Sequence, residues 1–220
     1  MGRKRRLDKE TIATVLTELH RLYPDAGPEL NYTNPFELLI ATILSAQCTD
    51  VRVNIVTEKL FAKYPSAKDY LSISEEELGK EIKSCGLYQS KAKNILKTCR
   101  ILVEEWESVI PNTREALVEL PGVGRKTANV VLSNAFDIPA IAVDTHVFRV
   151  SNRLGIANAK TVEKTEIQLM DRLPESMWSK GHHLFIFHGR RVCKSRKPNC
   201  PNCTLNEICL YFKYEVDNLK

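Results

Sequence analysis

The stretch LPGVGRKTA, residues 120–128, decides the fold of this 220-residue chain because it joins two helical segments through a tight turn. Pro121 and Gly122 end the first segment, and helical spacing resumes from Arg125. Gly122 and Gly124 can both take positive φ and leave backbone N–H groups open where the second helix begins, a natural site for a phosphate oxygen. The alternative is an ordinary helix–helix turn, which also favours glycine.

A lysine lies at the start of the second helix, where the positive end of the helix dipole disfavours an ammonium ion. Lys126 therefore belongs either to a solvated surface or to a site that needs a free amine. Lys126 and Thr127 match the end of a nucleotide-binding P-loop, but that motif needs glycine where this chain has Arg125 and Leu120. The remaining candidate for the phosphate ligand is a nucleic-acid backbone, bound without recognition of its base sequence.

Helical spacing recurs along the whole chain, and strand signals are almost absent. The sequence therefore predicts a compact all-α protein without internal repeats. Helical segments are expected at residues 12–19, 34–46, 90–106, 112–120, 144–155 and 162–173. Two further helices are expected to start at residues 74–77 and at residue 125.

The composition suits a globular protein with an anionic partner. Hydrophobic residues make up 43% of the chain, enough for a buried core, and 32 Lys and Arg against 27 Asp and Glu give a net charge of +5. No apolar secretory segment follows the basic start MGRKRRLDKE, and the apolar run Phe36–Ala46 is too short to span a bilayer. We expect a cytoplasmic, nucleoid-associated protein with no membrane partner.

Four cysteines near the end of the chain are crowded into the pattern C-x6-C-x2-C-x5-C, whereas the other three cysteines are scattered and read as small buried residues. Such crowding without a secretion signal indicates a metal site rather than disulfides. Zinc and an iron–sulfur cluster both remain possible, but zinc sites usually have two close pairs, so the spacing favours iron and sulfur. The expected ligands are Cys193, Cys200, Cys203 and Cys209.

A group of cations lies between the first two of these cysteines. Lys194, Arg196 and Lys197 occupy this loop, and Arg190 and Arg191 come just before it. A loop held at both ends by metal would fix these charges in an array that neutralises phosphates. The alternative is a solvated basic loop.

Four motifs together identify the chain as resembling the endonuclease III family of DNA glycosylases. They are LPGVGRKTA, VDTH at residues 143–146, LSAQCTD at residues 44–50 and the cysteine spacing, and they occur in family order. The resemblance implies a six-helix barrel containing a helix-hairpin-helix at residues 28–138. Residues 1–27 and 139–220 would then form a second helical domain that carries a 4Fe-4S cluster, with a cleft between the domains.

The resemblance also implies base-excision repair of oxidised pyrimidines in duplex DNA. Lys126 matches the nucleophile that attacks the anomeric carbon, releases the base and forms a Schiff base, and β-elimination then cuts the strand on the 3′ side. Asp144 matches the essential carboxylate, although it is equally suited to cap the helix that follows. The damaged nucleotide must leave the base stack before it can react.

The same resemblance assigns contacts with DNA. Gln47 would fill the hole left by the flipped nucleotide, and Leu87 would act as a wedge, with loop packing as its alternative role. His146 is expected to line the cleft or to be structural. The full set of expected DNA-binding residues is Gln47, Leu87, Gly122, Gly124, Arg125, Lys194, Arg196 and Lys197. The partner is double-stranded DNA with damaged bases or abasic sites, bound by a monomer.

Two other functions compete with this one. An adenine-mismatch glycosylase without lyase activity generally lacks the lysine and carries a further C-terminal domain, for which the residues after Cys209 leave no room. The second competing function is a non-catalytic protein that uses the hairpin and the cysteine loop only to bind DNA. Covalent trapping through Lys126 separates both from a lyase.

Overall fold

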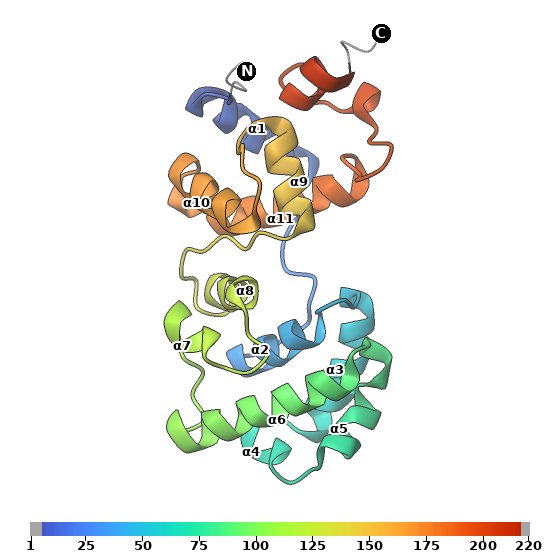
Figure 1. Cartoon of the computed structure of the whole chain (residues 1–220), viewed down its shortest axis with the longest axis vertical. Helices are drawn as coiled ribbons and strands as arrows, with labels where there is room; N and C mark the ends of the chain where they lie inside the picture. The colour runs from blue at the N-terminus through green and yellow to red at the C-terminus, as the bar shows by residue number, and fades with distance from the viewer. Residues whose placement is uncertain (1–5, 217–220) are drawn as a thin grey trace. The chain divides into compact units, whose positions relative to one another are not determined.

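The chain divides into two units by its internal contacts. The middle unit is Pro28–Ile138, and the terminal unit combines Met1–Gly27 with Pro139–Lys220. The computed structural model describes residues 6–216, so most of the basic start and the last four residues lie outside the described residues. In Figure 1, α1 (Lys9–Leu22) from the start of the chain lies in the same unit as α9 (Thr145–Leu154) and α11 (Trp178–Arg191) from its second half, and residues of all three helices share one core.

Every regular element within residues 6–216 is helical, which confirms the all-α fold class. No helix in this range is long and apolar enough to cross a membrane. The terminal unit also contains α10 (Val162–Arg172), η2 (Glu175–Met177), η3 (Cys200–Asn202) and η4 (Phe212–Val216). The middle unit contains α2 (Pro35–Leu44), α3 (Asp50–Lys63), α4 (Ala67–Tyr70), α5 (Glu75–Glu81), η1 (Lys83–Cys85), α6 (Tyr88–Glu105), α7 (Arg114–Val118) and α8 (Arg125–Ala135).

The middle unit is built around α2, which packs against α3, α6 and α8. The side chain of Asn34 caps this helix by accepting a hydrogen bond from Glu37 N at 3.0 Å, and Pro35 occupies its first turn. All the residues from Leu38 to Leu44 are buried. The apolar run thus forms a buried helix that ends at Leu44, two residues before the predicted end, and its central place explains why it is apolar on nearly all sides.

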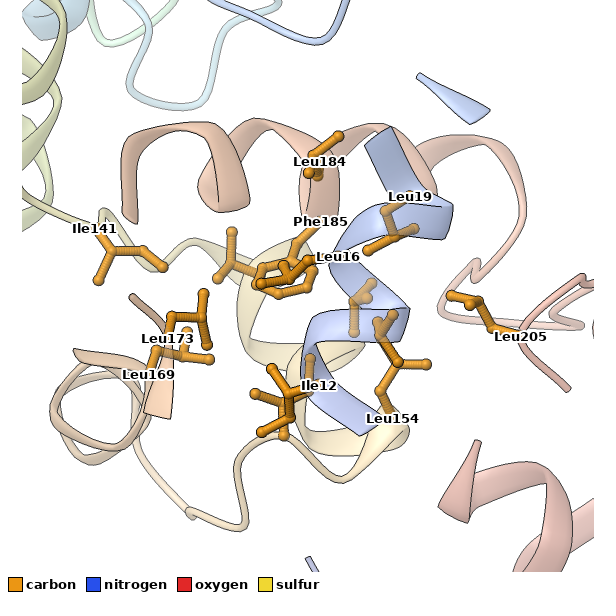
Figure 2. Close-up of a cluster of buried hydrophobic side chains, with 14 of the residues drawn as sticks. Ile12, Leu16, Leu19, Ile141, Leu154, Leu169, Leu173, Leu184, Phe185 and Leu205 are labelled. Carbon is orange, nitrogen blue, oxygen red and sulfur yellow. The ribbon is translucent and has the colours of Figure 1, made fainter. Parts of the chain in front are cut away.

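The terminal unit has its own core, in which both ends of the chain meet. Figure 2 shows Ile12, Leu16 and Leu19 of α1 among buried side chains from the second half of the chain, including Leu154 and Phe185. Each fully buried side chain of this size stabilises the fold by about 1.5–3 kcal/mol. The apolar face of α1 thus packs against α11 and shares one buried core with α9.

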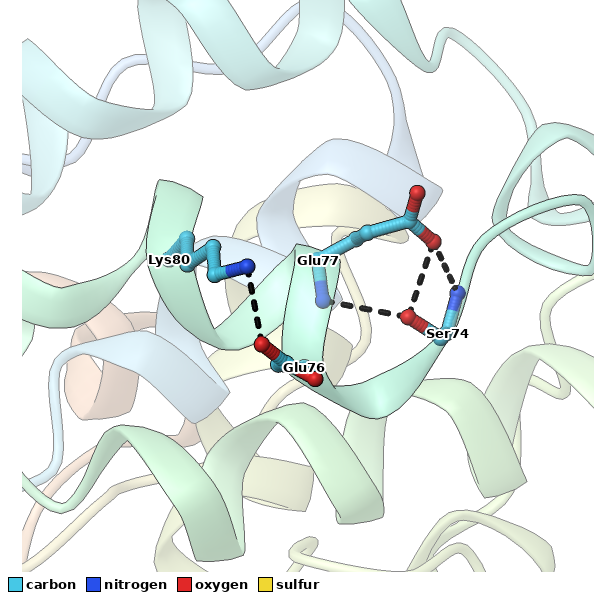
Figure 3. A network of polar contacts seen from close by, with 4 residues as sticks. All are labelled: Ser74, Glu76, Glu77 and Lys80. Carbon is cyan, nitrogen blue, oxygen red and sulfur yellow. Dashed lines mark hydrogen bonds and ion pairs between the residues drawn. The ribbon is translucent and has the colours of Figure 1, made fainter.

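A capping box begins α5, as its sequence predicts (Figure 3). Glu77 N donates to Ser74 Oγ at 3.2 Å, and Ser74 N donates to the Glu77 carboxylate at 2.8 Å. Lys80 and Glu76 add an exposed ion pair at 2.8 Å, which contributes no more than about 0.5 kcal/mol. Pairing the backbone groups at this helix start is the larger effect.

Two helix starts differ from the sequence prediction. Helix α7 is capped by Thr113, whose hydroxyl accepts a hydrogen bond from Ala116 N, and not by Asn112. Helix α6 begins at Tyr88, before Ser90, and Leu87 at its cap position makes no side-chain capping bond. A start without a polar cap leaves no signal in the sequence.

Candidate active site

The glycine hairpin lies between α7 and α8, which makes the expected helix-hairpin-helix (Figure 1). Leu120 and Val123 are buried, and Thr98 donates a hydrogen bond to Pro121 O at 3.0 Å, so the turn is tied to α6. Gly122 has φ +83°, and a Cβ there would lie 3.1 Å from Asn94 Cβ. Only glycine meets both conditions without strain.

Gly124 differs from the expectation of positive φ, since its φ is −92°. It is instead the extended N-cap residue of α8, and no heavy atom lies within 4 Å of the position a Cβ would take. Because glycine has no side chain, the first turn of α8 has no side-chain cap. The open backbone at this helix start suits a phosphate oxygen.

Lys126 is the second residue of α8, and its side chain is exposed. Water therefore reaches this amine in the free protein. Lys126 belongs to the middle unit and Asp144 to the terminal unit.

Asp144 is the N-cap residue of α9 and is half-buried. Its Oδ1 accepts hydrogen bonds from His146 N at 2.8 Å and Val147 N at 2.7 Å. The capping role predicted from the sequence is confirmed. Since both bonds end on one oxygen, the cap leaves the second carboxylate oxygen available for chemistry.

Gln47 and Leu87 share a backbone feature that is uncommon outside glycine. Gln47 has φ 55° and Leu87 has φ 47°, both in the left-handed region, and both side chains are exposed. Leu87 keeps 56% of its surface exposed, so the alternative role in loop packing is not what the structure shows. Large residues held exposed at such positions are characteristic of functional loops.

The four expected metal ligands line one cavity of the terminal unit, together with Arg153 and His188. Over residues 6–216 these thiols form no disulfide, and no three His, Cys, Asp or Glu side chains converge on a point that one ion could occupy. One cavity thus holds all four thiols, and thiolate sulfur is a ligand that soft metal groups prefer.

Burial has a clear effect on these thiols. It raises the pKa of Cys209 to about 11, and it also raises the pKa of Cys203 and of Cys200. Without a cation these groups hold their protons, so any metal group that binds here must displace them.

Two arginines of α9 hold the cysteine loop, and sequence reasoning missed both. Arg149 Nε donates to Cys193 O at 3.0 Å, while Arg153 donates to Lys194 O at 2.7 Å and to Ser195 O at 3.1 Å. Their spacing of four residues places both on one helix face, the only signal the sequence offers. The basic loop is thereby tied to the helix that Asp144 caps.

His146 is held by the same arrangement. Its Nδ1 accepts a hydrogen bond from Arg149 Nη2 at 3.0 Å, because a guanidinium has no acceptor. Burial lowers the pKa of His146, although the negative charge of Asp144 acts to raise it. These contacts support the structural role for this histidine.

Lys194, Arg196 and Lys197 are all exposed in the loop that the two arginines fix. We expect replacement of all three by serine to weaken binding to undamaged duplex and to make the slope of log K against log [salt] less negative by about 2–3, at about 0.9 for each lost phosphate contact. Fluorescence-anisotropy titrations from low to moderate salt measure the slope. Serine replacements of Lys68 and Lys80, exposed residues of α4 and α5, serve as controls; an unchanged slope in the triple variant would refute the phosphate contacts.

Comparisons with known proteins point to one family. Residues 40–175 match the model of the HhH-GPD superfamily base excision DNA repair proteins. The chain is 50% identical over 204 residues to endonuclease III of Bacillus subtilis (strain 168), covering 92% of this chain and 93% of that protein. A non-covalent endonuclease III–DNA complex matches with TM-score 0.90 and 50% identity, over 94% of this chain and 97% of that chain. A trapped endonuclease III–DNA covalent intermediate matches with TM-score 0.89 and 50% identity, over 94% of this chain and 98% of that chain.

Proposed function

Since the chain belongs to the endonuclease III proteins of the HhH-GPD superfamily, we propose that it is a bifunctional DNA glycosylase and AP lyase of base-excision repair. Its substrates are oxidised pyrimidines in duplex DNA and the abasic sites that their removal leaves. The observation that carries this proposal is the exposed Lys126 amine in the uncapped first turn of α8. We propose that the protein works as a monomer on chromosomal DNA in the cytoplasm.

Base release is the first chemical step. The unprotonated Lys126 nitrogen attacks C1′ of the deoxyribose, and the C1′–N bond to the damaged base breaks. The base leaves with the electron pair of that bond and takes up a proton.

Strand cleavage follows on the same lysine. Opening of the sugar ring gives a Schiff base between Lys126 and C1′, which withdraws electrons from C2′. Loss of a C2′ proton then expels the 3′ phosphate by β-elimination. Water hydrolyses the Schiff base and returns the free lysine.

Asp144 supports the first step as a carboxylate. Its Oδ1 is held by the backbone of α9, so the group is fixed in orientation before substrate binds. The remaining oxygen offsets the positive charge that builds on the sugar as the base leaves, and it helps the lysine lose its proton. A preorganised charge of this kind costs no rearrangement during the reaction.

Gln47 and Leu87 would open the duplex. We assign Gln47 to the space left by the extruded nucleotide and Leu87 to a wedge between neighbouring bases. Extrusion costs a few kcal/mol in lost stacking, and inserted side chains recover part of it. The backbone N–H groups at Gly122, Gly124 and Arg125 would hold a phosphate beside the opened site.

Cys193, Cys200, Cys203 and Cys209 would hold a 4Fe-4S cluster. When bound, the cluster supplies four iron–thiolate bonds that fix the cysteine loop. Arg153 donates a hydrogen bond to Cys193 Sγ at 3.5 Å, and His188 Nε2 lies 3.7 Å from Cys203 Sγ. Both side chains lie close enough to hydrogen-bond to thiolate sulfur. With the cysteine loop fixed by the cluster, the cations of the loop would contact DNA phosphates.

Protein purified without oxygen should show a broad absorption band at about 400 nm and about four irons per chain, as four-cysteine iron–sulfur sites do. Cys209→Ser should lose the band, because one of the four ligands is removed. Cys48→Ala, at a scattered cysteine, should keep it. A colourless protein with one zinc per chain would contradict the cluster.

Borohydride trapping tests the proposed function directly. A duplex with a single oxidised pyrimidine should give a covalent protein–DNA adduct, and an undamaged duplex should give none. Base release without an adduct would indicate a glycosylase that lacks lyase activity. Binding without base release would indicate a protein that only grips DNA, and either result would overturn the proposal.

A further inference from the structure

Lys91 is a buried cation that the proposed chemistry does not use. It lies on α6 with 4% of its surface exposed. Its Nζ donates hydrogen bonds of 2.8 Å to Leu44 O and 2.8 Å to Cys85 O. Burial lowers the pKa of this lysine. A lysine so placed loses hydration and side-chain entropy, so its retention in an apolar surrounding calls for a compensating role.

The two carbonyl groups that Lys91 binds lie at the ends of separate elements. Leu44 is the last residue of α2 and Cys85 the last residue of η1. Carbonyl groups at helix ends have no partner within their own helix, and a cation satisfies them well. One ammonium group therefore ties together two segments that are about forty residues apart in the sequence.

Each tied carbonyl comes shortly before one of the residues assigned to DNA opening. Gln47 follows Leu44 after Ser45 and Ala46, and Leu87 follows Cys85 after Gly86. Beside the bond from Lys91 to Cys85 O, burial and the neighbouring Cys48 thiol raise the pKa of Cys85 to about 11. Lys91 thus ties the loop of Gln47 and the loop of Leu87 to the same helix, α6.

We propose that Lys91 is a positioning residue that fixes the spacing of Gln47 and Leu87, so that both can enter the duplex together. This inference rests on the proposed function of those two side chains. Lys91 does not touch the reacting atoms: it acts through the backbone of the two loops. Its removal should harm base extrusion more than the chemistry at C1′.

Lys91→Met removes both donors and keeps a long apolar side chain. Base release from a paired oxidised pyrimidine should fall by roughly 10- to 100-fold, as misplacement by about 1 Å can do. Cleavage at a preformed abasic site, where no base has to be extruded, should fall by less than about threefold. Lys91→Arg should restore much of the loss, because it keeps N–H donors of similar reach.

A matched control and a probe of extrusion complete the test. Lys97→Met changes an exposed lysine of the same helix and should behave as the unmodified protein. A 2-aminopurine next to the lesion should brighten on binding of the unmodified protein and brighten less with Lys91→Met. If Lys91→Met does not fold, as judged by circular dichroism, Lys91→Gln provides the same comparison with a shorter donor.

Two results would overturn the inference: an equal loss on the paired lesion and on the abasic site, or no loss on either. The first would make Lys91 merely structural, and the second would make it dispensable. Failure of the proposed function is a separate outcome, because it would be seen in the unmodified protein as an absence of base release. The fluorescence measurement does not depend on catalysis, so it tests Lys91 in either case.

Discussion

Lys126→Ala should abolish borohydride trapping and lower base release by at least about a thousandfold, since removal of a catalytic nucleophile leaves only binding and electrostatic contributions. The side chain is exposed in the free protein, so the free energy of unfolding should change by no more than about 0.5 kcal/mol. Trapping on an abasic duplex, single-turnover base release and thermal melting measure the three quantities.

The neighbouring residue provides the control. Arg125→Ala removes a cation from the same helix turn, so it should weaken DNA binding while the trapped adduct still forms at saturating protein. The opposite pattern, with adduct retained by Lys126→Ala, would place the nucleophile elsewhere. In that case the hairpin would serve only to hold the DNA backbone.

Asp144 should show two separable effects, because one oxygen caps α9 and, in the proposed mechanism, the carboxylate charge assists base release. Asp144→Asn keeps a capping oxygen, so the free energy of unfolding should change by less than about 0.5 kcal/mol, whereas Asp144→Ala should cost about 1–2 kcal/mol. Both should lower base release by roughly 100- to 1000-fold, as loss of an electrostatic catalytic group does. Chemical denaturation and single-turnover kinetics distinguish the two effects.

Thr161→Ala is the matched control for the cap alone. Its hydroxyl caps α10 in the same unit by accepting a bond from Lys164 N, at a helix to which we assign no chemistry. It should lose stability without losing single-turnover rate. If Asp144→Asn released the base at the unmodified rate, Asp144 would be a cap and nothing more.

Much of this fold could be predicted because local signals and tertiary packing agree. Asn34 with Pro35 begins α2, Ser74 with Glu77 begins α5, and Asp144 begins α9 as its spacing indicates. In each case a polar side chain pairs the backbone N–H groups that the helix leaves unpaired. The motif residues of the site were placed by family resemblance, which periodicity alone does not supply.

The remaining features depend on contacts distant in sequence. The burial of Lys91 depends on carbonyl groups from α2 and η1, and the roles of Arg149 and Arg153 depend on the path of the cysteine loop. The left-handed backbone of Leu87 is uncommon for leucine, so the residue itself gives no signal of it in the sequence. Spacing along one helix contains no information about such partners.

The joining of both chain ends in one unit sets the order in which a nascent chain can mature. Helix α1 is translated before α9 and α11, so its apolar face lacks these core partners until they have been made. The middle unit, which is continuous in sequence, can compact while synthesis is still under way. A polypeptide that stalls after the middle unit would contain the Lys126 hairpin but lack Asp144, so under the proposed mechanism it would bind DNA phosphates without the carboxylate that supports base release.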